Sequence, residues 1–140
     1  MGLGTDGAAS NNNLDMFETM DVVAKVHKLF RRDPTVLQAR AVFRLATREG
    51  ARSLGLGDRV GSIEQGKLAD VVLVDGTGPE AVPLHDVYSQ LVYALKGGSV
   101  RTVVVGGRVV LRDRQSTTLD TAEVLARARA IAQRIRPVPR

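Results

Sequence analysis

A single carboxylate close to the start of the chain stands where it could do chemistry. Asp6 lies between Gly4 and Gly7, after a short apolar approach that predicts the end of a strand. A strand fixes the direction of the side chain that follows it, and a loop leaves that side chain accessible. Such a carboxylate can bind a metal ion or accept a proton. The same residues also fit a plain Asp-Gly turn without chemistry.

Two polar residues of the following loop are candidates for substrate contact. Ser10 and Asn11 follow Asp6 in the same polar loop. As loop and helix-capping residues they need no such role. Both interpretations stay open on the residues alone.

Composition limits the kind of protein. The chain has 140 residues, of which 44% are apolar and 25% charged, as in one globular domain or part of a larger one. It has no cysteine, which excludes a disulfide framework and a Cys-based zinc site and makes a reducing cytoplasm the default expectation. No apolar run approaches the roughly 18 residues that span a bilayer, so we expect no membrane contact.

A net charge of +5 raises the question of nucleic acid. Much of the excess lies on and after the last predicted helix, and the five aromatic residues are not interleaved with the basic ones. A stacking platform for single strands is therefore not expected, and the arginines are best interpreted as a solvated face.

The elements that would position Asp6 are mainly helices. Residues 14–30 predict a helix with one apolar face, capped by a residue between Asn11 and Asn13; its stripe is Met16, Met20, Val23, His27 and Phe30. Residues 34–48 predict a second helix that Asp33 caps and Pro34 begins. A short helical turn is expected near residues 51–54. We interpret Met16 and Met20 as core packing.

Strand signals follow the helices. Glycines punctuate residues 55–66 but lack the spacing of a phosphate-binding loop, so they predict turns. Residues 70–75, 100–105 and 108–111 predict strands, and Gly106-Gly107 predicts a tight hairpin turn. Residues 87–95 favour a short helix. The last helix spans about 121–135, with Asp120 and Glu123 at capping-box spacing and Pro137 as a stop.

Several of these motifs together resemble the amidohydrolase superfamily. The segment Leu3-Gly4-Thr5-Asp6-Gly7-Ala8-Ala9-Ser10-Asn11-Asn12, with Leu14-Asp15-Met16-Phe17-Glu18 after it, is similar to the last barrel strand and following loop of that superfamily. The segment Gly61-Ser62-Ile63-Glu64-Gln65-Gly66-Lys67-Leu68-Ala69-Asp70 is highly specific to it. The nearest branch is the methylthioadenosine/S-adenosylhomocysteine deaminase and chlorohydrolase group. The resemblance extends to about residue 115.

The resemblance implies an α/β fold. The chain looks like the C-terminal fragment of a metal-dependent (β/α)8 barrel hydrolase, with the last strand and following helices in residues 1–54. Residues 55–115 would be part of a small β-sandwich, and residues 116–140 a C-terminal helix and tail. About seven barrel strands, most metal ligands and one part of the sandwich would precede Met1.

The resemblance also implies a reaction. In the family a divalent metal, usually zinc, is held by a His-x-His pair, later histidines and an aspartate that also helps to activate the bound water; that aspartate matches Asp6. A complete relative would hydrolyse C–N or C–Cl bonds of purine-like or other nitrogen heterocycles, most typically deaminating an adenosine derivative.

The chain departs from the family pattern in its histidines. It has only His27 and His85, and neither aligns with a family ligand. His27 lies on the apolar face of a predicted helix, which favours a core or hydrogen-bonded role, and His85 lies in a loop, which favours a surface or helix-start role. Catalytic zinc usually takes three protein ligands, so Asp6 alone would not hold it.

Two functional hypotheses result. The chain is the C-terminal portion of a metal-dependent aminohydrolase that is inactive in isolation. Alternatively, it is a non-catalytic truncated or split subunit that docks onto the missing N-terminal barrel portion or forms a homo-oligomer. Open strand edges and apolar stripes favour a partner in either case.

Overall fold

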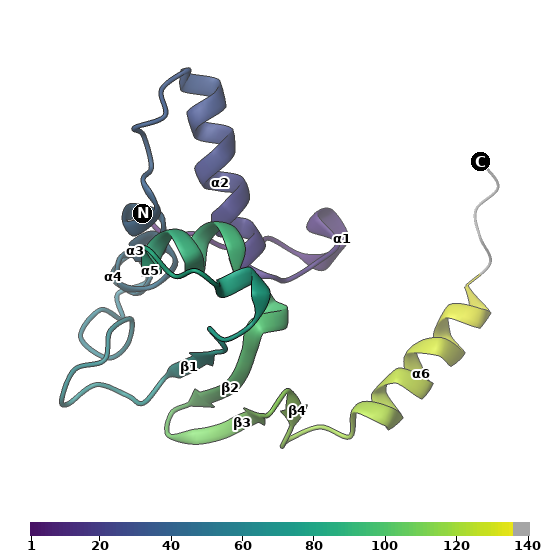
Figure 1. The fold of residues 1–140 in the computed structure, drawn as a ribbon. Helices are drawn as coiled ribbons and strands as arrows, with labels where there is room; N and C mark the ends of the chain where they lie inside the picture. Colours follow the sequence, from purple (N-terminus) through teal and green to yellow (C-terminus); the bar gives the residue numbers. More distant parts are fainter. Residues whose placement is uncertain (136–140) are drawn as a thin grey trace.

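The computed structural model describes residues 1–135, in which helices precede a small sheet. The first half contains α1 (Ala8–Asn11), α2 (Met16–Arg31), α3 (Ala39–Ala46) and α4 (Arg48–Ser53). β1 (Val71–Val74) is followed by four helical turns: η1 (Pro79–Ala81), α5 (Val87–Ser89), η2 (Gln90–Ala94) and η3 (Gly97–Ser99). Then come β2 (Val100–Val105), β3 (Arg108–Arg112), β4 (Gln115–Ser116) and α6 (Thr121–Arg134). Figure 1 shows the helices on one side, the sheet below them and α6 extending away.

The apolar core lies among the helices. Met20 and Ala24 of α2 pack with Ala39 and Val42 of α3 and with Val92 of η2. Partly buried neighbours extend this core; they include Leu3, Phe17, Phe43, Tyr88 and Tyr93. The rings of Phe43 and Tyr88 meet edge to face at 5.6 Å between centroids. The core therefore includes Leu3, which places the segment before Asp6 against the helices.

Helix α2 differs from the prediction at its start. Asp15 caps it, because its side chain accepts the N–H groups of Phe17 and Glu18. The expectation that a residue between Asn11 and Asn13 would cap this helix was wrong. Met20 is buried as predicted, but Phe30 of the predicted stripe is 83% exposed. The outer end of α2 projects beyond the other helices in Figure 1, so it has no core to enter.

The second predicted helix begins later and is interrupted. Asp33 accepts the backbone N–H and hydroxyl of Thr35 instead of capping a helix, and Leu37 has φ +44°. Helical backbone therefore starts only at Ala39. At Thr47 the backbone leaves the helical region, with φ −125° and ψ −96°, which separates α3 from α4. Pro34 is thus in a turn and not at a helix start.

The sheet is antiparallel, in the order β1-β2-β3-β4. Val72 pairs with Val103, and Val103 in turn with Leu111. The predicted Gly106-Gly107 turn is confirmed: both glycines have positive φ, +56° and +81°, which a residue with a Cβ adopts only at a cost. The outer edge of β1 has no strand beside it in residues 1–135.

Two expected β features are absent from the described residues. Residues 1–7 contain no strand; the Leu3 N–H instead donates to the Leu45 carbonyl of α3, at 3.1 Å. A strand is defined by pairing, and no described strand lies beside this segment. The predicted sandwich is a single sheet here, without a second layer in residues 1–135.

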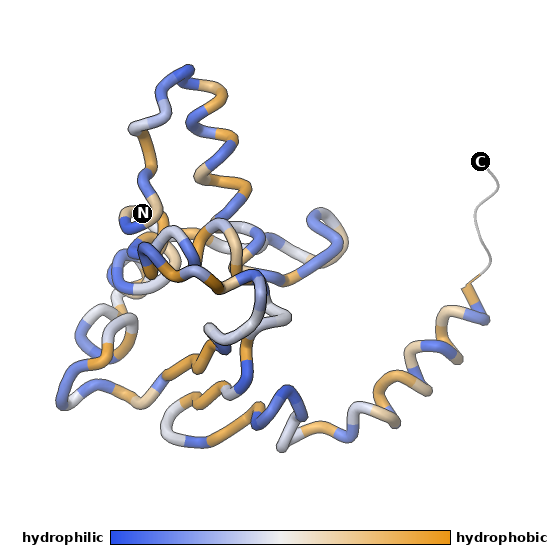
Figure 2. The backbone as a smooth tube through the Cα atoms, viewed as in Figure 1, coloured by the Kyte–Doolittle hydropathy of each residue, from blue (hydrophilic) through white to orange (hydrophobic). Residues whose placement is uncertain are grey.

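The last helix is as predicted at its start. Asp120 accepts the Glu123 N–H at 3.0 Å, and α6 ends at Arg134. None of its residues is buried, and Figure 2 shows apolar and polar residues alternating along it. Pro137, the expected stop, lies outside the described residues. No helix in residues 1–135 is long and apolar enough to cross a bilayer.

The chain exposes more surface than its size requires. Its accessible area is 10549 Å², whereas a compact monomer of this mass exposes about 7,000 Å². Large apolar side chains contribute to the excess; among them are Leu29 of α2, Leu54 after α4 and Ile63. Such surface is typical of a chain that packs against something else.

Candidate functional site

Asp6 lies at the exposed start of a tight loop, which we define as the Asp6 loop, residues 4–15. Its backbone is left-handed, with φ +58°, and its carboxylate accepts two hydrogen bonds. The Gly7 N–H donates to Oδ1 at 2.7 Å, and the Ser10 hydroxyl donates to Oδ2 at 2.8 Å. Each carboxylate oxygen therefore has one fixed donor, and the group as a whole faces solvent.

These two donors also set the charge state. The Gly7 N–H, and after it the Ser10 hydroxyl, hold the pKa of the Asp6 carboxyl below its usual value. The group is therefore ionised at neutral pH. An ionised, accessible and oriented carboxylate can accept a proton or bind a cation.

The other two predicted site residues are brought together with Asp6, but their polar groups act within the loop. Ser10 donates to Asp6 and lies 3.0 Å from the Gly7 carbonyl oxygen. Asn11 Nδ2 donates to the Thr5 carbonyl oxygen at 2.8 Å. Both residues are exposed. Their substrate contact stays a prediction, while their support of the loop is visible.

Asp15 is a functional candidate that the sequence-based prediction missed as a site residue. Its Oδ1 caps α2, and its Oδ2 accepts the Gly97 N–H at 3.0 Å, which connects the Asp6 loop to a segment 82 residues later. Asp15 and Glu18 have the spacing of a capping box. That spacing was the signal in the sequence for a cap at Asp15, but Asn11 to Asn13 also offered possible caps.

The described residues do not by themselves form a metal centre. Residues 1–135 contain no group of three His, Asp or Glu side chains able to surround an ion. His27 is exposed, so the expected core role was wrong: it lies in the second half of α2, after the buried residues Met20 and Ala24. His85 is exposed just before Asp86, which caps α5, in agreement with its predicted place. Within residues 1–135, Asp6 therefore has no cluster of further ligands beside it.

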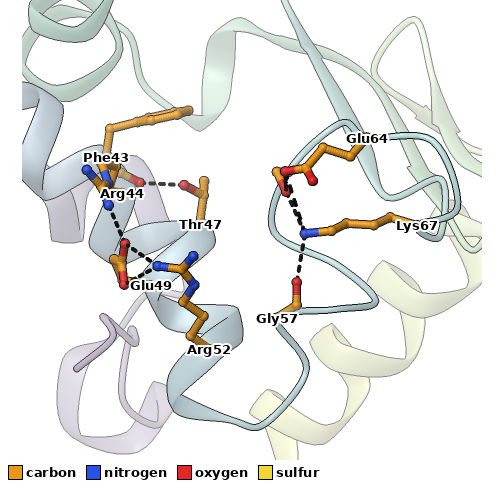
Figure 3. A network of polar contacts seen from close by, with 9 residues as sticks. Phe43, Arg44, Thr47, Glu49, Arg52, Gly57, Glu64 and Lys67 are labelled. Atoms are coloured by element: carbon orange, nitrogen blue, oxygen red, sulfur yellow. Dashed lines mark hydrogen bonds and ion pairs between the residues drawn. The ribbon is translucent and has the colours of Figure 1, made fainter.

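A second glycine-rich segment is built quite differently. We define the Lys67 segment as residues 57–70; it follows α4 and leads into β1. Lys67 Nζ donates to the Gly57 carbonyl oxygen and to Ser62 Oγ, both at 2.7 Å, and its side chain is only 12% exposed. Figure 3 shows the Lys67 side chain crossing the loop to reach Gly57. The amine therefore binds the two ends of the loop together.

The end of the same segment fixes the β2–β3 hairpin. Asp70 Oδ1 accepts the Gly106 N–H at 2.6 Å, and the Ala69 carbonyl accepts the Gly107 N–H at 3.0 Å. Gly61 contacts α4 so closely that a Cβ would stand 2.7 Å from Ala51 Cβ. The predicted turns of residues 55–66 are thus confirmed at Gly61, which has φ +94°.

Between the helices and the sheet lies an apolar groove of about 1090 Å³. One wall is formed by α3 and α4 with the segment before Asp6, and the other by β1 and the Lys67 segment. Its lining includes Leu3, Phe43, Leu54, Ile63 and Val72. Ile63 is 85% exposed. The groove does not contain Asp6, so it is a surface for packing next to the site and not the site itself.

Comparison with known proteins accounts for both glycine-rich segments. Residues 1–110 match the model of the amidohydrolase family. The chain is 49% identical over 135 residues to the 5-methylthioadenosine/S-adenosylhomocysteine deaminase of Syntrophobacter fumaroxidans, and 47% identical to the enzyme of that name from Desulforudis audaxviator. Each match covers 96% of this chain and 31% of the relative.

Solved structures give the same result. An adenosine deaminase from Xanthomonas campestris with bound zinc superposes with a TM-score of 0.93 at 47% identity, covering 98% of this chain and 31% of that one. The zinc complex of atrazine chlorohydrolase from Arthrobacter aurescens TC1 gives a TM-score of 0.79 at 29% identity, covering 93% and 29%. The chain spans about a third of the length of these relatives and corresponds to their C-terminal part. It therefore belongs to the amidohydrolase family.

Proposed function

We propose that this chain is the C-terminal portion of a metal-dependent aminohydrolase that deaminates an adenosine derivative. The reaction replaces a ring amino group with oxygen from water and releases ammonia. The observation that supports it most is the accessible, ionised carboxylate of Asp6 in a loop whose surroundings match those of named deaminases.

In this proposal Asp6 provides one metal ligand and the proton-accepting oxygens. Ser10 and Gly7 orient those oxygens, and Ser10 and Asn11 border the substrate. The remaining ligands come from protein outside these 140 residues, since the described chain offers no cluster of three. We propose that the barrel strand ending at Asp6 and the sandwich layer of residues 55–115 form only with that protein, and that the isolated chain does not hydrolyse substrate.

A chimera tests this proposal directly. The matched C-terminal segment of the Syntrophobacter enzyme is replaced by residues 1–140 of this chain, and ammonia release is measured with 5-methylthioadenosine and S-adenosylhomocysteine. We expect zinc-dependent deamination by the chimera and none by the truncated enzyme or by the chain alone.

Asp6→Asn in the chimera should reduce kcat/KM by about 10²–10⁴-fold, since a positioned proton acceptor contributes that much. Asp33→Asn is the matched control, because Asp33 is another exposed aspartate held by a hydroxyl and an N–H group. A folded but inactive chimera, or an active Asp6→Asn chimera, would contradict the proposal.

The second candidate function is docking without catalysis, and the apolar groove favours it. The groove, the unpaired edge of β1 and the excess exposed area all lie on a chain that covers 31% of its relatives. We propose that the occupant is the barrel portion that those relatives carry upstream. Sedimentation of the chain with the truncated Syntrophobacter enzyme should show a 1:1 complex; self-association of the chain alone would favour a homo-oligomer.

A further inference from the structure

The Asp6 loop is tied to the rest of the chain at its C-terminal end. Within residues 1–135, the hydrogen bonds of residues 4–14 stay inside the loop or reach only Glu18. The exception to this local pattern comes from Asp15, which closes the loop and accepts the Gly97 N–H. Leu3 is bonded to Leu45 just before the loop. The loop is therefore held between two fixed points.

The Asp15–Gly97 contact is built for a carboxylate and a glycine. Asp15 is half-buried and divides its oxygens, with Oδ1 on the Phe17 N–H at 2.8 Å and Oδ2 on the Gly97 N–H at 3.0 Å. A Cβ on residue 97 would lie 2.8 Å from Oδ2. Gly97 does not have positive φ, so what requires glycine there is the close approach and not the backbone conformation.

A second contact strengthens the same junction. Asp21, further along α2, pairs with Lys96 at 3.1 Å and with Lys25 at 2.7 Å. Burial opposes ionisation of Asp21, but the two lysines outweigh it and hold its pKa below the usual value. The first turns of α2 are therefore held against residues 96–97 by the Asp15–Gly97 hydrogen bond and the Asp21–Lys96 ion pair.

A series of hydrogen bonds through Asn13 and Asn11 connects Asp15 with the backbone next to Asp6. Asn13 Oδ1 accepts the Asp15 N–H at 3.2 Å and lies 3.5 Å from Asn11 Nδ2. Asn11 Nδ2 in turn holds the Thr5 carbonyl at 2.8 Å, directly before Asp6. Asp6 has left-handed backbone, with φ +58°, a conformation that is uncommon outside glycine and that the hydrogen bonds of the loop support here.

We propose that Asp15 is a positioning residue for Asp6, and that it acts by joining the Asp6 loop to the Gly97 N–H. This inference rests on the proposed function for its effect on zinc and catalysis, but the tether itself is a property of this chain. Asp15 touches neither substrate nor metal; it fixes where the loop ends.

Asp15→Asn tests the tether with little change in shape. The Asn side chain still caps α2 through its oxygen, since Asn and Asp are equally favoured as N-caps, but its NH2 group cannot accept a hydrogen bond from the Gly97 N–H. In the chimera we expect zinc affinity, measured by chelator competition, to fall about 10–100-fold, as for other residues that support a ligand from behind. Per zinc-loaded molecule, kcat should also fall, which a loss of stability alone would not cause.

Two further variants separate positioning from stability. Gly97→Ala keeps the Asp15 carboxylate and the cap but forces the two apart, so it should reproduce the loss of zinc affinity. Asp120→Asn is the matched control, because Asp120 caps α6 through the Glu123 N–H and has no second acceptor role. Unchanged zinc affinity in Asp15→Asn or Gly97→Ala would overturn the inference.

Hydrogen exchange distinguishes this inference from the proposed function. In the 140-residue chain, Asp15→Asn should accelerate exchange of the amides of residues 7–14 at least several-fold, while Asp120→Asn should not. If the unmodified chimera is inactive, the proposed function fails and this measurement alone decides the inference. Equal exchange in Asp15→Asn and the original chain would then overturn it.

Discussion

The Asp6 loop and the Lys67 segment are both glycine-rich, polar and matched to one family, yet they use their polar groups in opposite ways. In the Asp6 loop the donors converge on one exposed carboxylate. In the Lys67 segment the largely buried amine of Lys67 donates to Gly57 and Ser62 of the same segment. A family motif can thus mark chemistry or architecture, and what distinguishes them is whether the charged group faces solvent or is enclosed.

The largest effect on stability should come from closing the space at Gly61. Gly61→Ala should lower the free energy of unfolding by about 2–4 kcal/mol, because positive φ costs 1–2 kcal/mol and the Cβ meets Ala51 and the Arg48 backbone. Gly66→Ala is the control: Gly66 has φ +91° but open space around it, so only about 1–2 kcal/mol is expected. Urea unfolding measures both. Equal losses would show that the packing against α4 contributes nothing.

Removing the enclosed amine should have the next largest effect. Lys67→Met keeps the length of the side chain but leaves the Gly57 carbonyl and Ser62 without their donor, which should cost about 1.5–3 kcal/mol. Arg127→Met removes an exposed i,i+4 ion pair with Glu123 and should cost under about 0.5 kcal/mol. If the two variants unfold at the same urea concentration, Lys67 does not hold the segment together.

The smallest effect should come from a change in the Asp6 loop, and it should alter the pKa of Asp6 more than the stability of the chain. Ser10→Ala removes one of the two donors, so the pKa of Asp6 should rise toward its ordinary value while the Gly7 N–H keeps it from rising fully. Because the Asp6 pKa is lower in the folded state than in the unfolded state, where it is 3.8, the ionised carboxylate stabilises the fold above pH 3.8. This stabilisation is lost as the pH falls through the pKa of the folded state. Ser10→Ala should narrow the pH range between the two pKa values.

Carboxyl chemical shifts measured between pH 2 and 6 report this change. Thr35→Ala is the matched control: the Thr35 hydroxyl is the largest cause of the lowered pKa of Asp33, so that pKa alone should rise. An unchanged Asp6 titration in Ser10→Ala would show that the serine is not its donor in solution.

Local signals in the sequence were sufficient where the cause is local. The Gly106-Gly107 turn and the Asp120 cap need only neighbouring residues, and both were predicted correctly. Asp15 caps α2 through the nearby Phe17 and Glu18 N–H groups, so this cap had a local signal; only its second contact, with the Gly97 N–H, shows in no local pattern. The late start of α3 follows the turn after Asp33, where Leu37 has φ +44° and so cannot belong to a right-handed helix.

The candidate site was predictable only as a motif. Asp6, Ser10 and Asn11 could be selected because their segment resembles the amidohydrolase superfamily, but the directions of their hydrogen bonds could not be predicted from the sequence. His27 shows the opposite error: periodicity placed it on an apolar face, while burial requires a partner surface that residues 1–135 do not provide there. A periodic pattern predicts which face of a helix is apolar, but it does not show whether another part of the chain packs against that face.

The unpaired edge of β1 has a consequence for handling the protein. Val71–Val74 is a run of four apolar residues without proline or charge, a sequence that templates cross-strand aggregation when it is exposed. Asp70 and Asp75 flank it, so antiparallel pairing of two copies would bring like charges together. These two acids therefore act as gatekeepers along the free edge, and replacing both with neutral residues should favour pairing between copies of β1.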